Sequence, residues 1–129
     1  MRSRGPVIAS KKLDILVVDD ESQIGELLLE VLSQEGYRTA WYANAYDGLR
    51  QLARKNPRLV LADVMLPGMD GVELVKRAGE AGTCPMPRFV LMSAAPRPPG
   101  APRDVPFLRK PFDLDSALGV IRAELAKAS

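Results

Sequence analysis

The sequence predicts an α/β fold with a doubly wound, five-stranded parallel sheet that carries helices on both faces. Three observations lead to this prediction. Short continuous apolar runs, typical of strands buried on both faces, alternate with segments whose apolar residues recur at helical spacing. Several of these runs end directly in an acidic or hydroxyl side chain. The length of 129 residues and the apolar share of 47% fit one globular domain.

The first half of the chain is expected to supply three strands and two helices. The run Leu13–Val18 (LDILVV) ends in two acids, and the segment Glu21–Gln34 places its apolar residues on one helical face before Gly36. The next segments are a strand rich in aromatic and β-branched residues, a helix that stops before a proline, and a short apolar strand: Tyr37–Tyr42, Tyr46–Lys55 and Leu59–Ala62. This order implies parallel strands joined by right-handed crossovers.

The second half is expected to supply two helices and two strands. A helix is predicted near Val72–Ala81, after the loop MLPGMDG, and a strand at Arg88–Met92 (RFVLM). Val105–Arg109 (VPFLR) is predicted to be an edge strand, because Pro106 cannot donate a hydrogen bond to a neighbouring strand. The last helix, Asp113–Ala128, carries an apolar stripe, and its first residue can cap it.

The prolines gather between the last two strands. Six of the eleven lie in residues 91–112, and no proline-free run from Ala94 to Val105 exceeds three residues. An α-helix tolerates proline only in its first turn, so no helix is expected here. We favour a solvated, polyproline-II-like loop. The alternative is a docking segment, since PRPP and PGAP have the PxxP spacing that aromatic grooves recognise.

Charge is distributed unevenly along the chain. Residues 1–12 contain four cations and no acid, and these cations account for the formal net charge of +2. We therefore expect a flexible basic tail at 1–12, a domain at 13–129, and no direct binding of nucleic acid. No apolar run is long enough to span a membrane, and the single cysteine permits no internal disulfide. A cytoplasmic protein is expected.

Five polar side chains are predicted to meet at one edge of the sheet. Asp19 and Asp20 follow the first strand, Asp63 the third, Ser93 the fourth and Lys110 the fifth. In open parallel sheets, ligands bind beyond the carboxyl ends of the strands. Clustered carboxylates raise one another's pKa unless a cation is present, and a set of oxygen ligands suits Mg²⁺, or Mn²⁺.

The residue inventory narrows the chemistry of this edge. The chain has no histidine, and its one cysteine is not at a strand end, which excludes a zinc site and a histidine-activated nucleophile. An aspartate can itself act as a nucleophile toward a phosphoryl group, with the metal screening the charge between them. The ammonium and the hydroxyl could then hold the other phosphoryl oxygens.

Four motifs, in order along the chain, resemble a known family. They are VVDDE at 17–21, LADVMLPGMDG at 61–71, the serine of LMSA, and LRKPF at 108–112. Over essentially residues 13–127 the chain resembles the receiver domain of two-component response regulators, as in chemotaxis regulators. The resemblance implies a flavodoxin-like sheet of order 2-1-3-4-5.

The resemblance also implies roles for the residues at the sheet edge. Asp63 would be the phosphoacceptor, and Asp19, Asp20, Asp63 and the backbone carbonyl of Met65 would hold the divalent metal. Lys110 would bind a phosphoryl oxygen.

Further residues would transmit the signal or shape the backbone, again by resemblance. Ser93 and Phe107 would be the switch residues, and the bond before Pro111 would be cis. Relatives place a fourth helix between the strands that carry Ser93 and Lys110. Here we expect that helix to be absent and replaced by the proline-rich loop, which affects the output surface and not the chemistry.

Three functions remain open from the sequence. The first is a receiver that takes a phosphoryl group from a histidine kinase or histidine phosphotransfer protein and signals to a downstream protein, with a homodimer possible. The second is a phosphotransfer intermediate, or a receiver fragment of a larger kinase or regulator. The third is a Mg²⁺-dependent aspartyl-phosphate phosphohydrolase, which is disfavoured because such enzymes need a DxD motif and the chain has Asp19-Asp20-Glu21. We expect a signalling protein and no enzyme beyond its own phosphorylation and dephosphorylation.

Overall fold

The computed structural model describes residues 12–82 and 85–128. The predicted basic tail therefore lies, except for Lys12, outside the described residues. The described part forms one five-stranded sheet of order β2-β1-β3-β4-β5 in which all paired strands are parallel. The flavodoxin-like α/β fold and the strand order are thus confirmed.

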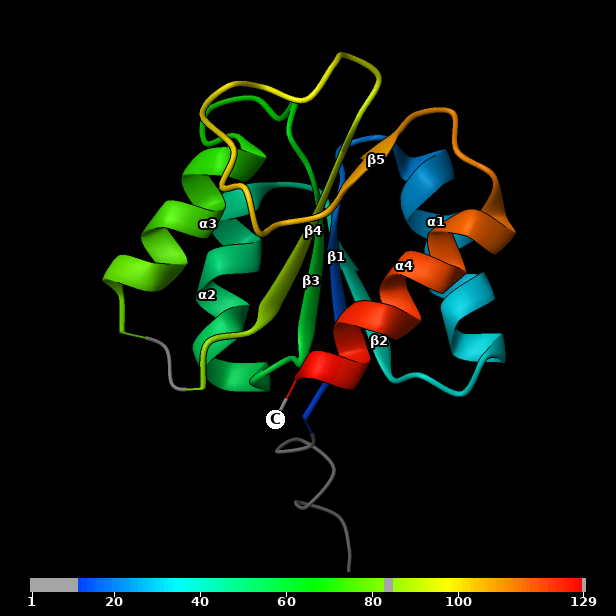
Figure 1. The fold of residues 1–129 in the computed structure, drawn as a ribbon. Helices are drawn as coiled ribbons and strands as arrows, with labels where there is room; N and C mark the ends of the chain where they lie inside the picture. Colours follow the sequence, from blue (N-terminus) through cyan, green and yellow to red (C-terminus); the bar gives the residue numbers. More distant parts are fainter. Residues whose placement is uncertain (1–11, 83–84, 129) are drawn as a thin grey trace, which may run out of the picture.

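Helices cover both faces of this sheet, with α2 and α3 on one side and α1 and α4 on the other (Figure 1). The strands are β1 (Ile15–Val18), β2 (Thr39–Tyr42), β3 (Leu59–Asp63), β4 (Arg88–Ser93) and β5 (Phe107–Arg109). The helices are α1 (Ser22–Gln34), α2 (Ala45–Lys55), α3 (Gly71–Glu80) and α4 (Leu114–Lys127). Within the described residues, no helix combines the length and apolar character that a membrane span requires.

The fold does contain a fourth helix in chain order, so the expectation of a fold lacking one is wrong as stated. That helix is α4, which follows β5; its N-cap Asp113 accepts a hydrogen bond from the Ser116 amide, and its apolar stripe packs on the sheet. The stretch between β4 and β5, residues 94–106, contains only turns and bends. Proline explains this local conformation, since its ring interrupts helical hydrogen bonding.

The central strands β1, β3 and β4 have buried side chains on both faces, as parallel strands in such folds do. Leu16 and Val18 pack against α2 and α3, whereas Ile15 and Val17 pack against α1 and α4. All four are completely buried. Because side chains alternate along a strand, one continuous apolar run supplies both halves of the core.

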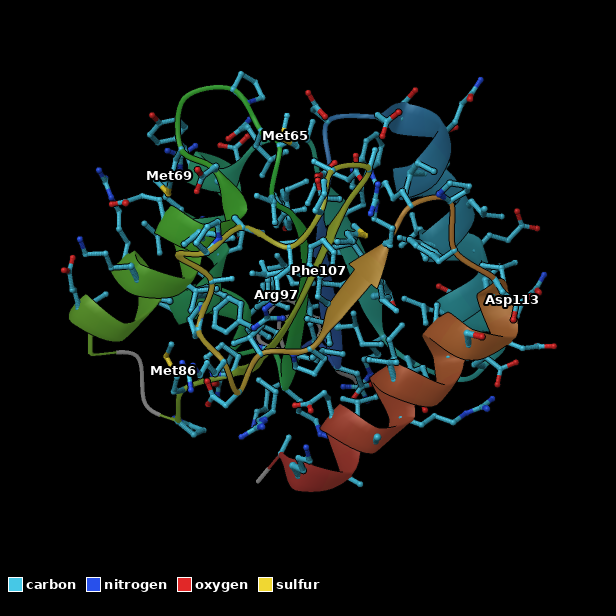
Figure 2. The ribbon with its side chains drawn as sticks, turned by 45° about the horizontal axis from the view of Figure 1, so that its top comes forward. Met65, Met69, Met86, Arg97, Phe107 and Asp113 are labelled. Carbon is cyan, nitrogen blue, oxygen red and sulfur yellow. The ribbon has the colours of Figure 1, made fainter. Side chains whose placement is uncertain are left out.

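The loop at residues 94–106 is packed on the core, so a fully solvated loop is the wrong description. Ala101 and Val105 are each only 8% exposed and join the core on the α2 and α3 side. The Arg97 guanidinium donates from Nη1 to the carbonyl of Val105 at 2.7 Å and from Nη2 to that of Pro102. Arg97 thus fastens the loop to itself, over the side of the molecule that carries α3 (Figures 1 and 2).

A buried acid that the sequence did not single out anchors the last helix. Glu124 of α4 is 2% exposed and accepts hydrogen bonds from Arg88 Nε and Lys127 Nζ, each at 3.0 Å. Burial alone would raise the pKa of Glu124, but the hydrogen bonds from the two cations outweigh it and lower that pKa below its ordinary value. The ion pair between Arg88 and Glu124 joins the start of β4 to the end of α4.

Removing the Arg97 guanidinium is expected to loosen the loop. Because Arg97→Ala deletes two hydrogen bonds at a partly solvated site, we expect a loss of about 1 kcal/mol in the free energy of unfolding. The amides of Ala101 and Val105, which donate to Pro98 and Pro102, should exchange faster with solvent. Hydrogen exchange and urea unfolding measure both effects.

The matched control is Arg103→Ala, which removes another exposed cation from the same loop. It should leave amide exchange in the loop unchanged. Equal exchange in Arg97→Ala and the wild type would show that packing alone holds the loop.

Candidate acidic phosphoacceptor site

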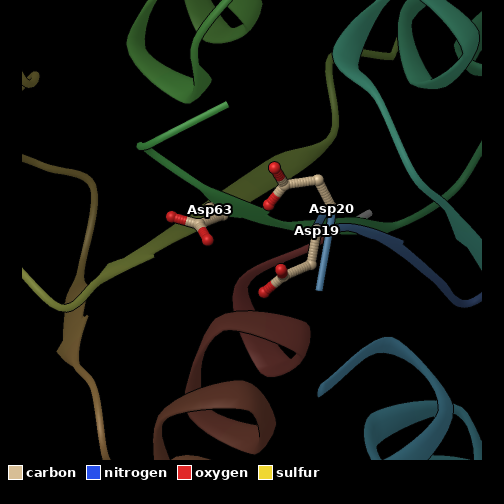
Figure 3. Close-up of side chains that lie close together, drawn as sticks. All are labelled: Asp19, Asp20 and Asp63. Carbon is tan, nitrogen blue, oxygen red and sulfur yellow. The ribbon is translucent and has the colours of Figure 1, made fainter. Parts of the chain in front are cut away.

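The carboxyl ends of the central strands bring three aspartates together (Figure 3). Asp19 and Asp20 follow β1, and Asp63 is the last residue of the adjacent strand β3. One carboxylate oxygen from each lies within 4.8 Å of those from the other two. Asp19 is completely buried and Asp63 is 4% exposed, whereas Asp20 is exposed. The cluster therefore has a buried floor and one acid open to solvent.

The Lys110 ammonium sits inside this cluster. Its Nζ lies 2.8 Å from Asp19 Oδ2, 2.8 Å from Asp63 Oδ2 and 2.8 Å from Glu21 Oε1. Burial alone would lower the pKa of Lys110, but the hydrogen bonds with Asp19, Asp63 and Glu21 outweigh it and raise that pKa. Lys110 is therefore charged at neutral pH. Glu21 is a contact that the sequence did not single out, although it adjoins the two acids.

The remaining oxygens of the buried acids are held by the backbone. Asp19 Oδ1 accepts from the Glu21 amide at 2.9 Å, and Asp63 Oδ1 accepts from the Met65 amide at 2.9 Å. Burial raises the pKa of Asp19, although its hydrogen bonds to Lys110 and to the Glu21 amide oppose that effect. The negative charge on Asp19 is thus costly in the absence of a further cation.

These donors fit a divalent metal of the Mg²⁺ kind. All candidate ligands are oxygens, three of them converge, and the raised pKa of Asp19 marks a carboxylate whose charge a cation would stabilise. The three aspartates would hold the ion. The backbone carbonyl of Met65 remains a predicted fourth ligand.

A pocket of about 440 Å³ opens above the acids. Its lining contains two of the three aspartates, the Glu21 and Lys110 side chains beside them, and parts of the loops after β3 and β4: Asp20, Glu21, Asp63, Met65, Ala94, Ala95 and Lys110. The Lys110–Pro111 bond is cis, as predicted. The pocket is large enough to admit a phosphoryl group beside Asp63.

The two predicted switch residues lie on the neighbouring strands β4 and β5, and the Ser93 carbonyl accepts a hydrogen bond from the Lys110 amide at 2.8 Å. Ser93, at the end of β4, is completely buried, and its Oγ accepts from the Ala95 amide at 3.1 Å. This is the structural role that a serine at a loop start commonly has. Phe107 of β5 is half-buried and packs on the core beside α2 and α3 (Figure 2). Their switch roles remain predictions.

A family model described as the response regulator receiver domain matches residues 15–121. The chain belongs to the response regulator receiver family. The resemblance drawn from the four sequence motifs is therefore confirmed, and the chain is a signalling domain of two-component systems.

Individual relatives agree with this assignment. The chain is 48% identical over 63 residues to sporulation initiation phosphotransferase F of Bacillus subtilis, a match that covers 49% of the chain and 51% of that protein. It is 31% identical over 117 residues to the response regulator receiver protein CpdR of Brucella abortus, covering 88% of the chain and 98% of CpdR. The matches span only 52% of the regulator YkoG of Bacillus subtilis and 24% of NtrC of Escherichia coli.

Solved structures of receiver domains share the fold. The receiver domain of NtrX from Brucella abortus has a TM-score of 0.78 at 32% identity, with 89% of this chain and 100% of that chain covered. The Thermotoga maritima response regulator TrrA, solved in complex with Mg²⁺-BeF, has a TM-score of 0.73 at 28% identity, with coverage of 85% and 96%.

Removing the Lys110 ammonium is expected to destabilise the protein. Lys110→Met leaves two buried carboxylates without their cation, and breaking such a pair typically costs about 3–5 kcal/mol in the free energy of unfolding. Saturating Mg²⁺ should restore part of this loss. Urea unfolding with and without Mg²⁺ measures both values.

The control Lys76→Met removes an exposed cation from α3. It should change stability by no more than about 0.5 kcal/mol and show the wild-type response to Mg²⁺. A Lys110→Met protein as stable as this control in the absence of metal would contradict the electrostatic account.

Proposed function

We propose that this receiver accepts a phosphoryl group on Asp63, with Mg²⁺ or Mn²⁺, from the phosphohistidine of a histidine kinase or histidine phosphotransfer protein. The observation that carries the proposal is the convergence of Asp19, Asp20, Asp63 and Lys110 at the carboxyl edge of the sheet, where all of them except the buried Asp19 line one pocket. An exposed acid, two buried acids and one ammonium are the groups that phosphoryl transfer to a carboxylate needs.

The chemistry follows from how each group is held. A carboxylate oxygen of Asp63 forms a bond to phosphorus while the bond from phosphorus to the donor nitrogen breaks, and the bonding electron pair stays on that nitrogen. The Met65 amide already donates to Asp63 Oδ1, and Lys110 Nζ lies at Oδ2, so the side chain is oriented before the donor arrives. After transfer, Lys110 remains beside the acylphosphate, where its charge can pair with a phosphoryl oxygen.

The three aspartates and, by family resemblance, the Met65 carbonyl would hold the metal. When bound, Mg²⁺ would screen the repulsion between the acids and the incoming phosphoryl oxygens. The similar TrrA structure was solved in complex with Mg²⁺-BeF, which supports this choice of cation for the present chain.

Ser93 and Phe107 are proposed to report phosphorylation. Ser93 Oγ would exchange its hydrogen bond with the Ala95 amide for one to a phosphoryl oxygen, which shifts the start of the loop at 94–106. Phe107 lies at the other end of that loop and has no hydroxyl, so it would respond through ring packing alone. A downstream protein would then recognise the changed loop surface.

A groove beside the acidic pocket suits the phosphodonor. Its apolar lining comes from α1 and from the turn between β5 and α4, and it includes Leu27, which is 42% exposed. It shares Glu21, Ala94 and Lys110 with the acidic pocket. A donor protein seated on this groove would therefore have its phosphohistidine close to Asp63.

A second candidate function is a phosphotransfer intermediate, or a receiver that forms part of a longer kinase or regulator. The similarity to a protein named as a phosphotransferase favours the first, and the partial coverage of YkoG and NtrC favours the second. In either case we propose a cytoplasmic protein whose receiver domain spans residues 13–129, preceded by a basic tail at 1–12. Both candidates use the same chemistry at Asp63.

Phosphorylation at Asp63 can be tested with a small phosphodonor. After incubation with acetyl phosphate and Mg²⁺, the intact mass of the wild type should increase by about 80 Da, the mass of one phosphoryl group on a carboxylate. Asp63→Asn should show no increase, because its amide is not a nucleophile. Chelating the metal should also prevent the increase.

Asp104→Asn, which changes an exposed acid of the proline-rich loop, is the matched control and should be modified like the wild type. Modification of Asp63→Asn to the wild-type extent would place the acceptor elsewhere. Rapid turnover of phosphate esters by the wild type would instead support a phosphohydrolase.

The phosphoryl group is expected to hydrolyse slowly in the isolated, metal-loaded protein. Met65 and Ala95 line the acidic pocket, each two residues beyond Asp63 and Ser93 respectively, and neither side chain can orient an attacking water. Ala95→Gln, which introduces an amide there, should shorten the lifetime several-fold. Loss of the phosphoryl mass increase with time measures the rate.

Ala94→Gln places the same amide at the neighbouring lining position and should have a smaller effect. A wild-type half-life of seconds would show that water is activated without these side chains.

A further inference from the structure

We propose that Trp41 is a positioning residue for the acidic pocket, because its indole N–H holds the main-chain carbonyl of Asp19. The inference rests on the proposed function, in which Asp19 is one of the groups that hold the metal. It concerns a residue of β2, a strand that contributes no side chain to the lining of the pocket.

The hydrogen bonds of Asp19 identify β2 as its support. Trp41 Nε1 donates to the Asp19 carbonyl at 2.7 Å, and the Asp19 amide donates to the Tyr42 carbonyl at 3.1 Å. Both main-chain polar groups of Asp19 are therefore bound to the neighbouring strand. Because β1 ends at Val18, these bonds fix the direction in which the chain leaves the sheet. That direction in turn orients the completely buried Asp19 side chain.

The first turn of α1 is shaped to admit the indole ring. A Cβ atom at Gly25 would lie 2.2 Å, 2.3 Å and 2.6 Å from three atoms of the Trp41 side chain, closer than side chains can approach. Glycine is unfavourable inside a helix, so its presence here needs a compensating reason. The ring supplies that reason, since it fills the space left by the missing side chain. Trp41 thus packs on α1, which follows Asp19, and pairs with Val17 of β1, which precedes it.

A role in apolar packing alone is the alternative explanation for Trp41, and it would not require the indole N–H. The ring is half-buried and lies against the core beside α1 and α4, so an aromatic side chain of similar shape would satisfy a purely apolar role. The indole N–H is the part that packing does not require. A buried carbonyl that loses its donor carries a desolvation penalty, which favours rearrangement of the chain around it. The two roles therefore separate in Trp41→Phe, which keeps an aromatic ring and deletes the donor.

Mg²⁺ binding measured by isothermal titration calorimetry tests the inference directly. Trp41→Phe should bind Mg²⁺ about tenfold more weakly than the wild type, because removing a group that orients a metal ligand typically weakens metal binding by that much or more. The control is Thr39→Val, which removes a hydroxyl that donates to the Tyr37 carbonyl from the same strand, at its opposite end. Thr39→Val should keep the wild-type affinity, although both variants lose one hydrogen bond of β2.

Equal Mg²⁺ affinity in Trp41→Phe and the wild type would overturn the inference and leave the proposed function intact. Equal weakening in both variants would also overturn it, since the effect would then be a general loosening of β2. A wild type that binds no Mg²⁺ would contradict the proposed metal site as well.

A measurement on the wild type alone covers the case in which Trp41→Phe does not fold. The chain contains one tryptophan, so its spectrum has one indole N–H signal in proton–nitrogen NMR. That proton should exchange slowly with solvent, and its signal should move when Mg²⁺ is added. A rapidly exchanging signal that Mg²⁺ leaves unmoved would overturn the inference.

Discussion

The structure depends on the interaction of one ammonium with two buried carboxylates at the carboxyl edge of the sheet. Lys110 lies 2.8 Å from both Asp19 and Asp63, which reach it from strands far apart in sequence. Burying any one of these charges alone would be strongly unfavourable, and the cluster is tolerable only when all of them are present. These groups carry more negative than positive charge, and a divalent cation can neutralise the excess. The groups that stabilise this edge of the sheet are thus the ones to which the proposed chemistry is assigned.

The sequence predicted the members of this cluster but few of the residues that hold them in place. Apolar runs that end in acids locate Asp19, Asp20 and Asp63, because parallel strands bring their carboxyl ends to one edge. The contact of Glu21 with Lys110 and that of Trp41 with Asp19 join residues 89 and 22 positions apart. Such contacts depend on side-chain directions that no local pattern encodes. The place of Ser93 after an apolar run predicts that it lies at this edge, whereas its hydrogen bond from the Ala95 amide is a feature of the folded loop.

In the proline-rich segment, too, local sequence predicts the backbone conformation but not the contacts with distant residues. Local sequence correctly excluded a helix from residues 94–106, because proline acts on the backbone of its own turn. It could not show that Ala101 and Val105 enter the core, or that Arg97 closes the loop on itself. The loop is therefore an ordered covering for the sheet beside α3. Ser93 directly precedes this loop and Phe107 directly follows it, so the two proposed switch residues lie at its ends.

The most direct test of the account is the dependence of Mg²⁺ affinity on the individual carboxylates. Calorimetric titration of the wild type, Asp20→Asn and Asp70→Asn separates the cluster from an acid outside it. We expect Asp20→Asn, which alters the exposed member without disturbing the ion pairs of Lys110, to bind Mg²⁺ at least tenfold more weakly, roughly the worth of one charged ligand contact. Asp70→Asn should match the wild type. Unchanged affinity in Asp20→Asn would show that the three aspartates do not form the metal site.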